Sequence, residues 1–276
     1  MSKQVKAAFR RELAKDDAEI NLAYAALLFT EYLTGPIDVS LYLSRLDAMA
    51  EALLPALLLA ETDQDRIETL NRYLFGELHF TGNTNNYYHP DNSFLNKVLE
   101  LRTGIPITLS LVYLEIGWRL GLPIWGIGLP GHFIVGYGPP DAPLYLDLFN
   151  GGLLLSEADC LALARVPLSN RLSFKEHFLK PASKKAILYR MLLNLKQIYL
   201  KAEQWEEAYR LVDLMFIAAH QTTDLRDRGL IAYRLDRRQA AIFDLQRYLF
   251  LLPHAPDSAW LKKRVETMEE ELLRLN

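Results

Sequence analysis

The chain has 276 residues, of which 50% are hydrophobic and 24% charged, and its formal net charge is −3. This length and composition allow a full core in one or two domains, and the mixed charge gives no reason to expect a nucleic-acid or membrane partner. A single cysteine excludes an internal disulfide, no apolar run reaches the roughly 18–20 residues of a membrane span, and the charged N-terminus lacks a signal-peptide core, so we expect a cytoplasmic protein.

The N-terminal part of the chain predicts helices. Residues 1–15 are polar and predict a frayed or loosely helical segment. Near-helical spacing of apolar residues predicts helices over 17–33, from Asp38 onward, and over 63–75. The third of these turns three apolar residues inward, namely Ile67, Leu70 and Leu74. We expect these helices to form a layer against a later sheet.

Residues 80–92 form a polar, aromatic and asparagine-rich loop by composition. Asp91, Asn92 or Ser93 can cap the helix that follows. One interpretation makes this loop a wall of a ligand-binding cleft. The other makes it a capping loop whose tyrosine rings pack on the domain, and this second interpretation is favoured.

A buried helix is predicted next. Pro106 suits a first helical position, where its missing N–H would have no helical partner. An almost unbroken apolar run extends from Ile107 to Leu120, which indicates burial on nearly every side. Gly121 and Pro123 then end the helix.

Three extended segments follow this helix. They cover Ile124 to Leu129, His132 to Tyr137, and Leu144 to Phe149. The Pro130-Gly131 pair predicts a turn between the first two segments. The pattern therefore predicts an antiparallel arrangement of strands.

The loop between the second and third strands decides which side chains face each other. If it centres on Pro139-Pro140, antiparallel pairing sets His132 directly opposite Asp147. Directly opposed side chains have Cβ atoms about 4.5–5.5 Å apart on one face of a sheet. We therefore expect the imidazole to meet the carboxylate, although a one-residue slip would separate them.

A buried helix followed by a strand histidine and a neighbouring aspartate is the layout of a Cys-His-Asp site. Four runs of the chain resemble the bacterial SirB1 family, namely NSFL at 92–95, RTGIPITLS at 102–110, GLPGHF at 128–133 and DLFNGG at 147–152. The resemblance implies an α+β fold, with a papain/transglutaminase-like core of helices packed on a small antiparallel sheet. It also implies that an all-α tetratricopeptide-like region follows this core.

The resemblance exposes a missing nucleophile. Active transglutaminase relatives carry Gly-x-Cys at the start of this helix, and setting Gly104 on that glycine puts Pro106 at the nucleophile position. His132 and Asp147 then fall on the other two catalytic positions. Proline has neither a thiol nor a backbone N–H for an oxyanion hole, and losing one such donor typically costs about a hundred- to a thousand-fold in rate.

Two hydroxyls lie close enough in sequence to be considered as substitutes. Ser110 is one helical turn from Pro106, where Cβ atoms are roughly 5–6 Å apart, whereas a general base must come within about 2.6–3.2 Å of its proton donor. Thr108 lies about 200° around the helix and faces elsewhere. The ligand contacts expected around His132 are Asn92, Ser110, Pro130, Gly131 and Asn150.

The remaining chain predicts helices. Ser156 and Asp159 suggest a capping box, and Cys160 in the helix that follows is expected to be a small core residue rather than a nucleophile. Ala208 and Ala241 occupy equivalent positions 33 residues apart (241 − 208), near the tetratricopeptide period of about 34 residues. The resulting domains are 1–180, transglutaminase-like, and 181–276, tetratricopeptide-like, with a terminal helix over 260–275.

Three functions are compatible with these residues. The first is a non-catalytic protein that binds a peptide or protein partner through the cleft and the repeat-like helices in a regulatory role. The second is an amide hydrolase or acyl transferase that uses Ser110, Thr108 or water with His132 as base. The third is a purely structural interaction module. No metal-ligand spacing or phosphate-binding loop is present in the sequence, so we expect no metal and no cofactor.

Overall fold

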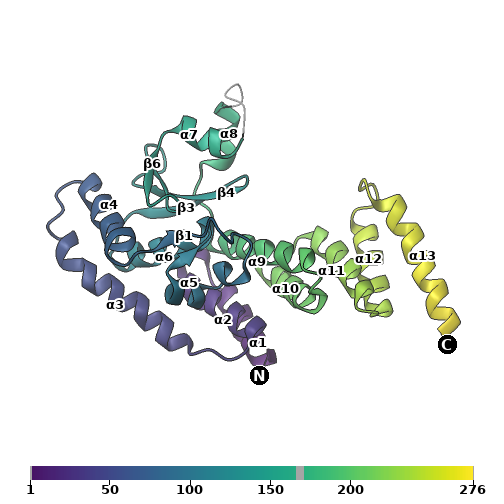
Figure 1. The fold of residues 1–276 in the computed structure, drawn as a ribbon. Helices are drawn as coiled ribbons and strands as arrows, with labels where there is room; N and C mark the ends of the chain where they lie inside the picture. Colours follow the sequence, from purple (N-terminus) through teal and green to yellow (C-terminus); the bar gives the residue numbers. More distant parts are fainter. Residues whose placement is uncertain (1, 166–170, 276) are drawn as a thin grey trace. The chain divides into compact units, whose positions relative to one another are not determined.

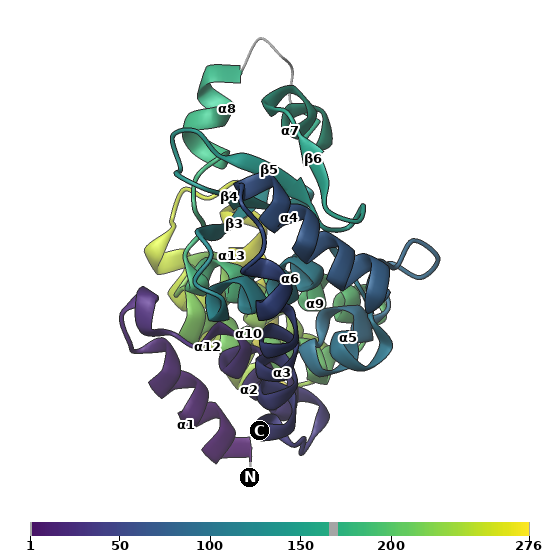
Figure 2. The same cartoon turned by 90° about the vertical axis from the view of Figure 1, so that its left-hand side faces the viewer.

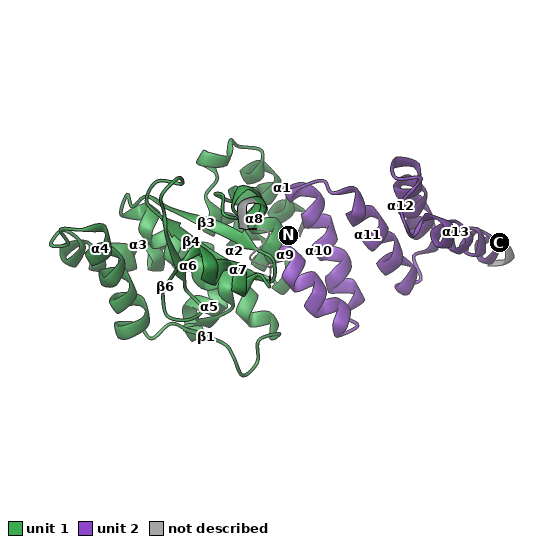
Figure 3. Ribbon diagram, turned by 90° about the horizontal axis from the view of Figure 1, so that it is seen from above, with its two compact units in different colours: residues 1–191 green, residues 192–276 purple. Residues whose placement is uncertain are grey.

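The computed structural model of this chain describes residues 2–165 and 171–275. These residues form many helices and a four-stranded sheet (Figure 1). The contact pattern divides the chain into two compact units, residues 1–191 and 192–276 (Figure 3). Each unit is described by itself.

The first unit contains most of the helices. They are α1 (Ser2–Leu13), α2 (Leu22–Thr34), α3 (Val39–Leu57), α4 (Asp63–Asn71), α5 (Leu95–Leu101), α6 (Pro106–Arg119), α7 (Glu157–Leu163), α8 (Arg171–Phe178) and the first part of α9 (Lys184–Lys201). Shorter helical turns are η1 (Asp17–Glu19), η2 (Arg72–Glu77) and η3 (Pro90–Ser93).

The N-terminal segment is a regular helix, so of the two states predicted for residues 1–15, frayed or loosely helical, the helical one is closer to the structure. α1 buries Val5, Phe9 and Leu13, and it packs on α2. These three residues are spaced by four, which gives a narrow apolar stripe. The stripe was not recognised in the sequence because charged residues surround it.

The sheet of the first unit is antiparallel, in the order β3-β4-β5-β6. Its strands are β3 (Ile124–Leu129), β4 (His132–Tyr137), β5 (Leu144–Asp147) and β6 (Leu153–Leu155). Two short parallel strands, β1 (Thr81–Gly82) and β2 (Thr103–Gly104), pair separately. β3 and β4 have the predicted bounds, β5 ends two residues early, and β1, β2 and β6 were not predicted.

Helix α6 is the centre of the first unit. It begins at Pro106, as predicted, and Gly121 with φ +69° follows its end. It packs on β3 and β4, while α2, α3 and α5 pack on α6 itself. A Cβ at Gly117 would lie 2.0 Å from Cδ1 of Ile124, so only glycine allows this closeness to β3. The expected layer of N-terminal helices on the sheet is present for α4, where the Tyr137 hydroxyl of β4 donates to Oδ1 of Asp63 at 3.1 Å, whereas α2 and α3 pack on α6.

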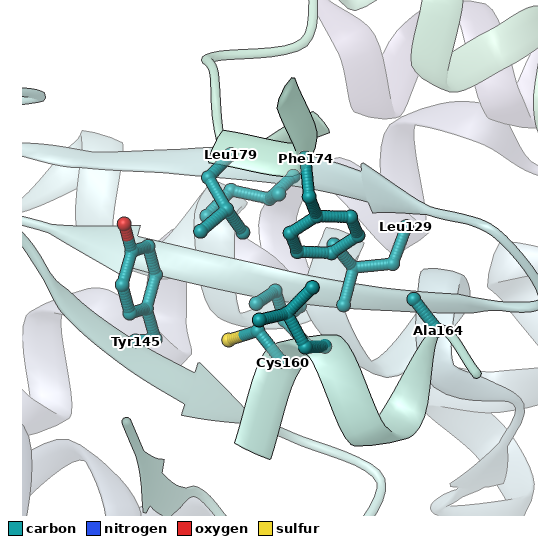
Figure 4. Close-up of a cluster of buried hydrophobic side chains, with 9 residues drawn as sticks. Leu129, Tyr145, Cys160, Ala164, Phe174 and Leu179 are labelled. Atoms are coloured by element: carbon teal, nitrogen blue, oxygen red, sulfur yellow. The ribbon is translucent and has the colours of Figure 1, made fainter. Parts of the chain in front are cut away.

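The other side of the sheet carries α7 and α8 (Figures 1 and 2). Ser156 and Asp159 form the predicted capping box at the start of α7. A cluster of buried side chains joins this helix to the sheet and to α8, as Figure 4 shows for Leu129, Tyr145, Cys160 and Phe174. Burial raises the pKa of the Cys160 thiol to about 12, so Cys160 is a core residue, as expected.

The second unit continues with α10 (Trp205–Ala218), α11 (Thr222–Arg234), α12 (Arg238–Leu251) and α13 (Ser258–Leu275). Successive helices pack on each other, and Ala208 and Ala241 are both fully buried. A Cβ at Gly229 would lie 2.7 Å from Leu245, so α11 and α12 approach closely there. Within the described part of the chain, no helix combines the length and the apolar character that crossing a bilayer requires.

Candidate functional site

His132 and Asp147 meet at the ends of two neighbouring strands. His132 is the first residue of β4, directly after the turn at Pro130 and Gly131, where Gly131 has φ +71°. Asp147 is the last residue of β5. Nε2 of His132 lies 3.0 Å from Oδ1 of Asp147, and the two side chains are 13% and 1% exposed. The expected approach of imidazole and carboxylate is present, while the role of the pair stays a prediction.

The register that brings them together differs from the predicted one. Val135 pairs with Leu146, and continuing this register sets His132 opposite Phe149 rather than Asp147. The prediction was wrong because the loop is centred one residue further along the chain than Pro139-Pro140. A shift of two residues leaves every side chain on its face, so His132 and Asp147 remain diagonal neighbours whose side chains can meet.

The groups around Asp147 favour its ionised form. Burial raises the pKa of this carboxyl, but His132, Asn150 and a backbone N–H oppose that effect and hold it below its ordinary value. Oδ1 accepts a hydrogen bond from the N–H of Phe149 at 3.0 Å, and Oδ2 accepts one from Nδ2 of Asn150 at 2.8 Å. Asn150, expected among the ligand contacts, therefore holds Asp147 in place.

The two candidate hydroxyls of α6 have contrasting surroundings. Oγ1 of Thr108 donates to the carbonyl of Asn92 at 2.7 Å and accepts from the N–H of Ile105 at 3.1 Å. Oγ of Ser110 is buried and has no hydrogen-bond partner among the described residues. Both residues are 0% exposed, in keeping with the predicted burial of this helix on nearly every side. Pro106, which the resemblance would place at the nucleophile position, is also buried.

The asparagine-rich loop is organised by one side chain. Nδ2 of Asn92 donates to the carbonyls of Asn86 and Tyr87 at 2.7 and 3.1 Å, and its Oδ1 accepts from Asn83 at 3.0 Å. The amide of Asn92 is thus occupied within the loop. Its expected contact with a ligand stays a prediction.

The predicted cap of the following helix is wrong. α5 begins after Phe94, and no side chain caps it. Asp91, Asn92 and Ser93 instead belong to the short helical turn η3, so they lie too early in the chain to cap α5. Asn92 is used by the loop rather than by the helix.

Aromatic rings connect His132 to the start of α6. The ring centroids of His132 and Phe149 are 6.4 Å apart, and those of Phe149 and Tyr87 are 5.9 Å apart, both edge-on. A Cβ at Gly82 would lie 2.6 Å from the Phe149 ring, and Gly82 pairs with Gly104, two residues before α6 begins. Phe149 and its contacts are therefore part of the site, although the sequence analysis did not single out Phe149.

A further residue of the site, Arg190, also escaped the sequence analysis. Nη2 of Arg190 donates to the backbone carbonyl of His132 at 2.7 Å, and its guanidinium lies 6.0 Å from the ring centroid of Phe133. No local signal marks Arg190, because its position in α9 looks like an ordinary charged position of an amphipathic helix. Only the tertiary structure brings it beside His132.

Within residues 2–165 and 171–275, no group of three or more His, Cys, Asp or Glu side chains has an arrangement suited to a metal ion.

Comparisons with known proteins match both units. A family described as the Transglutaminase-like superfamily matches residues 40–193, and one described as Tetratricopeptide repeat matches residues 195–266. The chain is 36% identical over 242 residues to a UPF0162 protein of Xylella fastidiosa, covering 86% of each chain. It is 26% identical over 236 residues to Protein SirB1 of Salmonella typhimurium, covering 85% of this chain and 86% of that one.

A more distant match concerns a longer protein. The chain is 31% identical over 160 residues to F-box only protein 21 of Homo sapiens. The matched segment is 55% of this chain but only 24% of that one. Together with the family matches, these similarities confirm the expected α+β transglutaminase-like core followed by tetratricopeptide helices.

Proposed function

This chain belongs to the SirB1 family of transglutaminase-like proteins, and from that premise we propose that it acts without catalysis, by binding a peptide or protein in a regulatory role. The observation that carries the proposal is Pro106. At the first position of α6 it offers no nucleophilic atom and no N–H donor, although His132 and Asp147 remain paired. We place this activity in the cytoplasm.

The state of the neighbouring hydroxyls supports binding over hydroxyl-based catalysis. Thr108 already uses its hydroxyl to join the start of α6 to the carbonyl of Asn92. Ser110 is fully buried, so a substrate reaching its Oγ would have to displace the packing of the central helix. A nucleophile must be accessible and within reach of its base, and neither hydroxyl meets both conditions.

The contacts of Asp147 favour a second candidate function, that of a purely structural module. The carboxylate joins His132, Phe149 and Asn150, so it stabilises the end of β5 whether or not a ligand binds. Under this alternative, the pair would maintain the hairpin only. Alanine at His132 or Asp147 would then lower the melting temperature and leave partner binding unchanged.

The tetratricopeptide unit supports a protein partner. Phe243 and Phe250 are seven residues apart on α12 and are 62% and 84% exposed. Residues at this spacing share a helix face, and large exposed apolar side chains on one face are typical of interaction surfaces. We therefore propose that this face of α12 takes part in contact with a partner.

Activity measurements test the central claim. The purified full chain is assayed for peptide, amide and ester hydrolysis and for amine transfer, in parallel with His132→Ala. We expect no turnover above the level of the variant. Turnover that His132→Ala abolishes would contradict the proposal and favour the enzyme alternative, including its water-based form.

Covalent trapping separates the forms of that alternative. A hydroxyl-directed probe is added to the full chain, and peptides are mapped for adducts. We expect no adduct at Ser110 or Thr108. An adduct at either position that depends on His132 would establish a hydroxyl nucleophile.

A further inference from the structure

Arg190 is a partly buried cation in direct contact with the site. It lies in the part of α9 that belongs to the first unit, and its Nη2 holds the carbonyl of His132 at 2.7 Å. Its guanidinium also lies near the ring of Phe133, on the same strand. Arg190 therefore contacts the strand that carries His132 at two adjacent residues.

Arg190 has no anionic partner. Among the described residues, no Asp or Glu side chain lies within ion-pair distance of its guanidinium. Burial lowers the pKa of Arg190. A cation removed from water is normally paired, because an unpaired one is costly.

The guanidinium of Arg190 has N–H donors without a partner among the described residues. One of its five N–H groups is used by the His132 carbonyl, whereas Nη1 and Nε have no partner among the described residues. A Cβ at Gly128 would lie 3.2 Å from Nη1, so a side chain at that position would crowd the guanidinium. An arginine fork with free donors matches the two oxygens of a carboxylate.

The surroundings of Arg190 are aromatic. The Phe133 ring lies beside its guanidinium, and the carbonyl that Arg190 binds belongs to His132. The ring of His132 contacts Phe149, which in turn contacts Tyr87. Aromatic rings beside a cation favour a ligand that combines an apolar side chain with a negative group. A peptide that ends in an apolar residue has this combination, since the terminal carboxylate and the last side chain share one Cα.

We propose that Arg190 binds the C-terminal carboxylate of a peptide whose last residue is apolar, and that it holds this end beside His132 against Tyr87 and Phe149. This inference rests on the proposed binding function and names the chemistry of its ligand. The carboxylate occupies the free edge of the guanidinium, and the last side chain contacts the aromatic rings. The site thereby recognises a chain end rather than an internal segment.

The test uses the full chain and a probe dipeptide, N-acetyl-Leu-Phe. Binding is followed by NMR shifts of the histidine ring protons, with probe concentrations up to 50 mM. Two related probes separate the sources of negative charge: N-acetyl-Leu-Phe amide has none, and N-acetyl-Glu-Phe amide carries it on a side chain. Inorganic phosphate serves as a competing anion.

We expect the free-acid probe to bind at least about tenfold more tightly than either amide, the effect of losing one charge-assisted hydrogen-bond pair. Arg190→Gln should remove this difference, and Arg190→Lys should retain part of it. Arg247→Gln is the matched control, since Arg247 lies exposed in the other unit. Thermal melting of each variant establishes that it is folded.

Three results would overturn the inference. They are equal binding of acid and amide probes, binding of the acid that survives Arg190→Gln, and no binding of any probe. Phosphate binding that depends on Arg190 without binding of the dipeptide would also overturn it, because the site would then recognise an isolated anion. The proposed function fails by a separate result, namely His132-dependent turnover, so the two failures are distinguishable.

Discussion

Two partly buried arginines, one in each unit, have opposite surroundings. Arg228 of the tetratricopeptide unit contacts Asp244 through Nε and Nη2 at 2.7 and 2.8 Å, and it contacts Asp213 through Nη1 at 2.9 Å. Its guanidinium also lies 4.5 Å from the ring centroid of Phe216. Arg190 of the transglutaminase-like unit has one carbonyl partner and no carboxylate among the described residues.

The pKa directions express the same contrast. Burial lowers the pKa of Arg228, but Asp244 and Asp213 more than reverse this effect and raise it. At Arg190, burial prevails and the pKa is lowered. Arg228 is thus part of a closed set of charges that stabilises helix packing, whereas Arg190 has capacity left for another group. The fold thus uses the charge of Arg228, whereas the charge of Arg190 is available to a ligand.

The largest expected effect concerns Arg228 and its partners Asp244 and Asp213. Arg228→Met should lower the free energy of unfolding of the second unit by about 3 kcal/mol, because Asp244, only 2% exposed, would keep a buried charge without its partner. Urea unfolding followed by circular dichroism measures the change. Arg247→Met, at an exposed position, is the control and should change stability by less than about 0.5 kcal/mol. Equal effects of the two variants would contradict the stabilising role given to the contacts of Arg228 with Asp244 and Asp213.

The next effect concerns Asp147. Asp147→Ala should destabilise the first unit by about 2 kcal/mol, because the N–H of Phe149 and the side chain of Asn150 would lose their buried acceptor. Urea unfolding at neutral pH measures this loss. A destabilisation smaller than that of an exposed control, Asp141→Ala, would contradict the role given to the carboxylate.

The stability contributed by Asp147 should also depend on pH. The folded pKa of this carboxyl lies below its unfolded value of about 3.9. Its ionised form therefore stabilises the fold above that pH, and the contribution is lost as the pH falls through the folded pKa. The difference in stability between the native chain and Asp147→Asn should shrink below about pH 4. A difference that stays constant down to pH 2 would contradict the assignment.

The sequence predicted the local elements of this site well and its tertiary details less well. β3 and β4 have the predicted bounds, and α6 begins where predicted and ends one residue early, because Pro106, the Pro130-Gly131 turn and Gly121 each act within a few residues. The β4–β5 register was wrong because it depends on how the intervening loop folds. Even so, a two-residue error preserves the face of each side chain, so the pairing of His132 with Asp147 could be predicted.

The role of Arg190 could not be predicted from local sequence patterns. Nothing within one helical turn of Arg190 distinguishes it from the other charged residues of α9. What distinguishes it is that no carboxylate of the described residues lies beside it and that it contacts the carbonyl of His132, which is 58 residues away in the chain. The aromatic contact of Phe149 with Tyr87 likewise depends on two distant loops meeting. Such features follow from tertiary contacts that periodicity does not encode.

A thiol at position 106 would report on the position of His132. Pro106→Cys should give a thiol with a pKa about one unit below the 8.5 of a free cysteine, which corresponds to about 1.4 kcal/mol, if the imidazole of His132 stabilises the thiolate. The pH dependence of alkylation by iodoacetamide measures this pKa. Cys160, whose pKa is raised to about 12 by burial, is an internal reference that should stay unreactive.

The double variant Pro106→Cys/His132→Ala is the control for this effect. Its thiol should titrate near 8.5 if the imidazole is responsible for the shift. An ordinary pKa in both variants would mean that His132 does not face the start of α6. The interpretation of Pro106 as a replaced nucleophile would then lose its geometric basis.

The smallest expected effect on the free energy of unfolding is that of replacing Arg190. Arg190→Met removes a hydrogen bond to the His132 carbonyl, which costs about 1 kcal/mol, but it also removes a desolvated charge without an anionic partner. These effects oppose each other, so the free energy of unfolding should change by less than about 1 kcal/mol in urea. A loss as large as that of Arg228→Met would mean that the fold itself needs this cation. A near-neutral change combined with lost carboxylate binding would mean that Arg190 is retained for a ligand, because a fold that gains nothing from an unpaired charge has no structural reason to bury it.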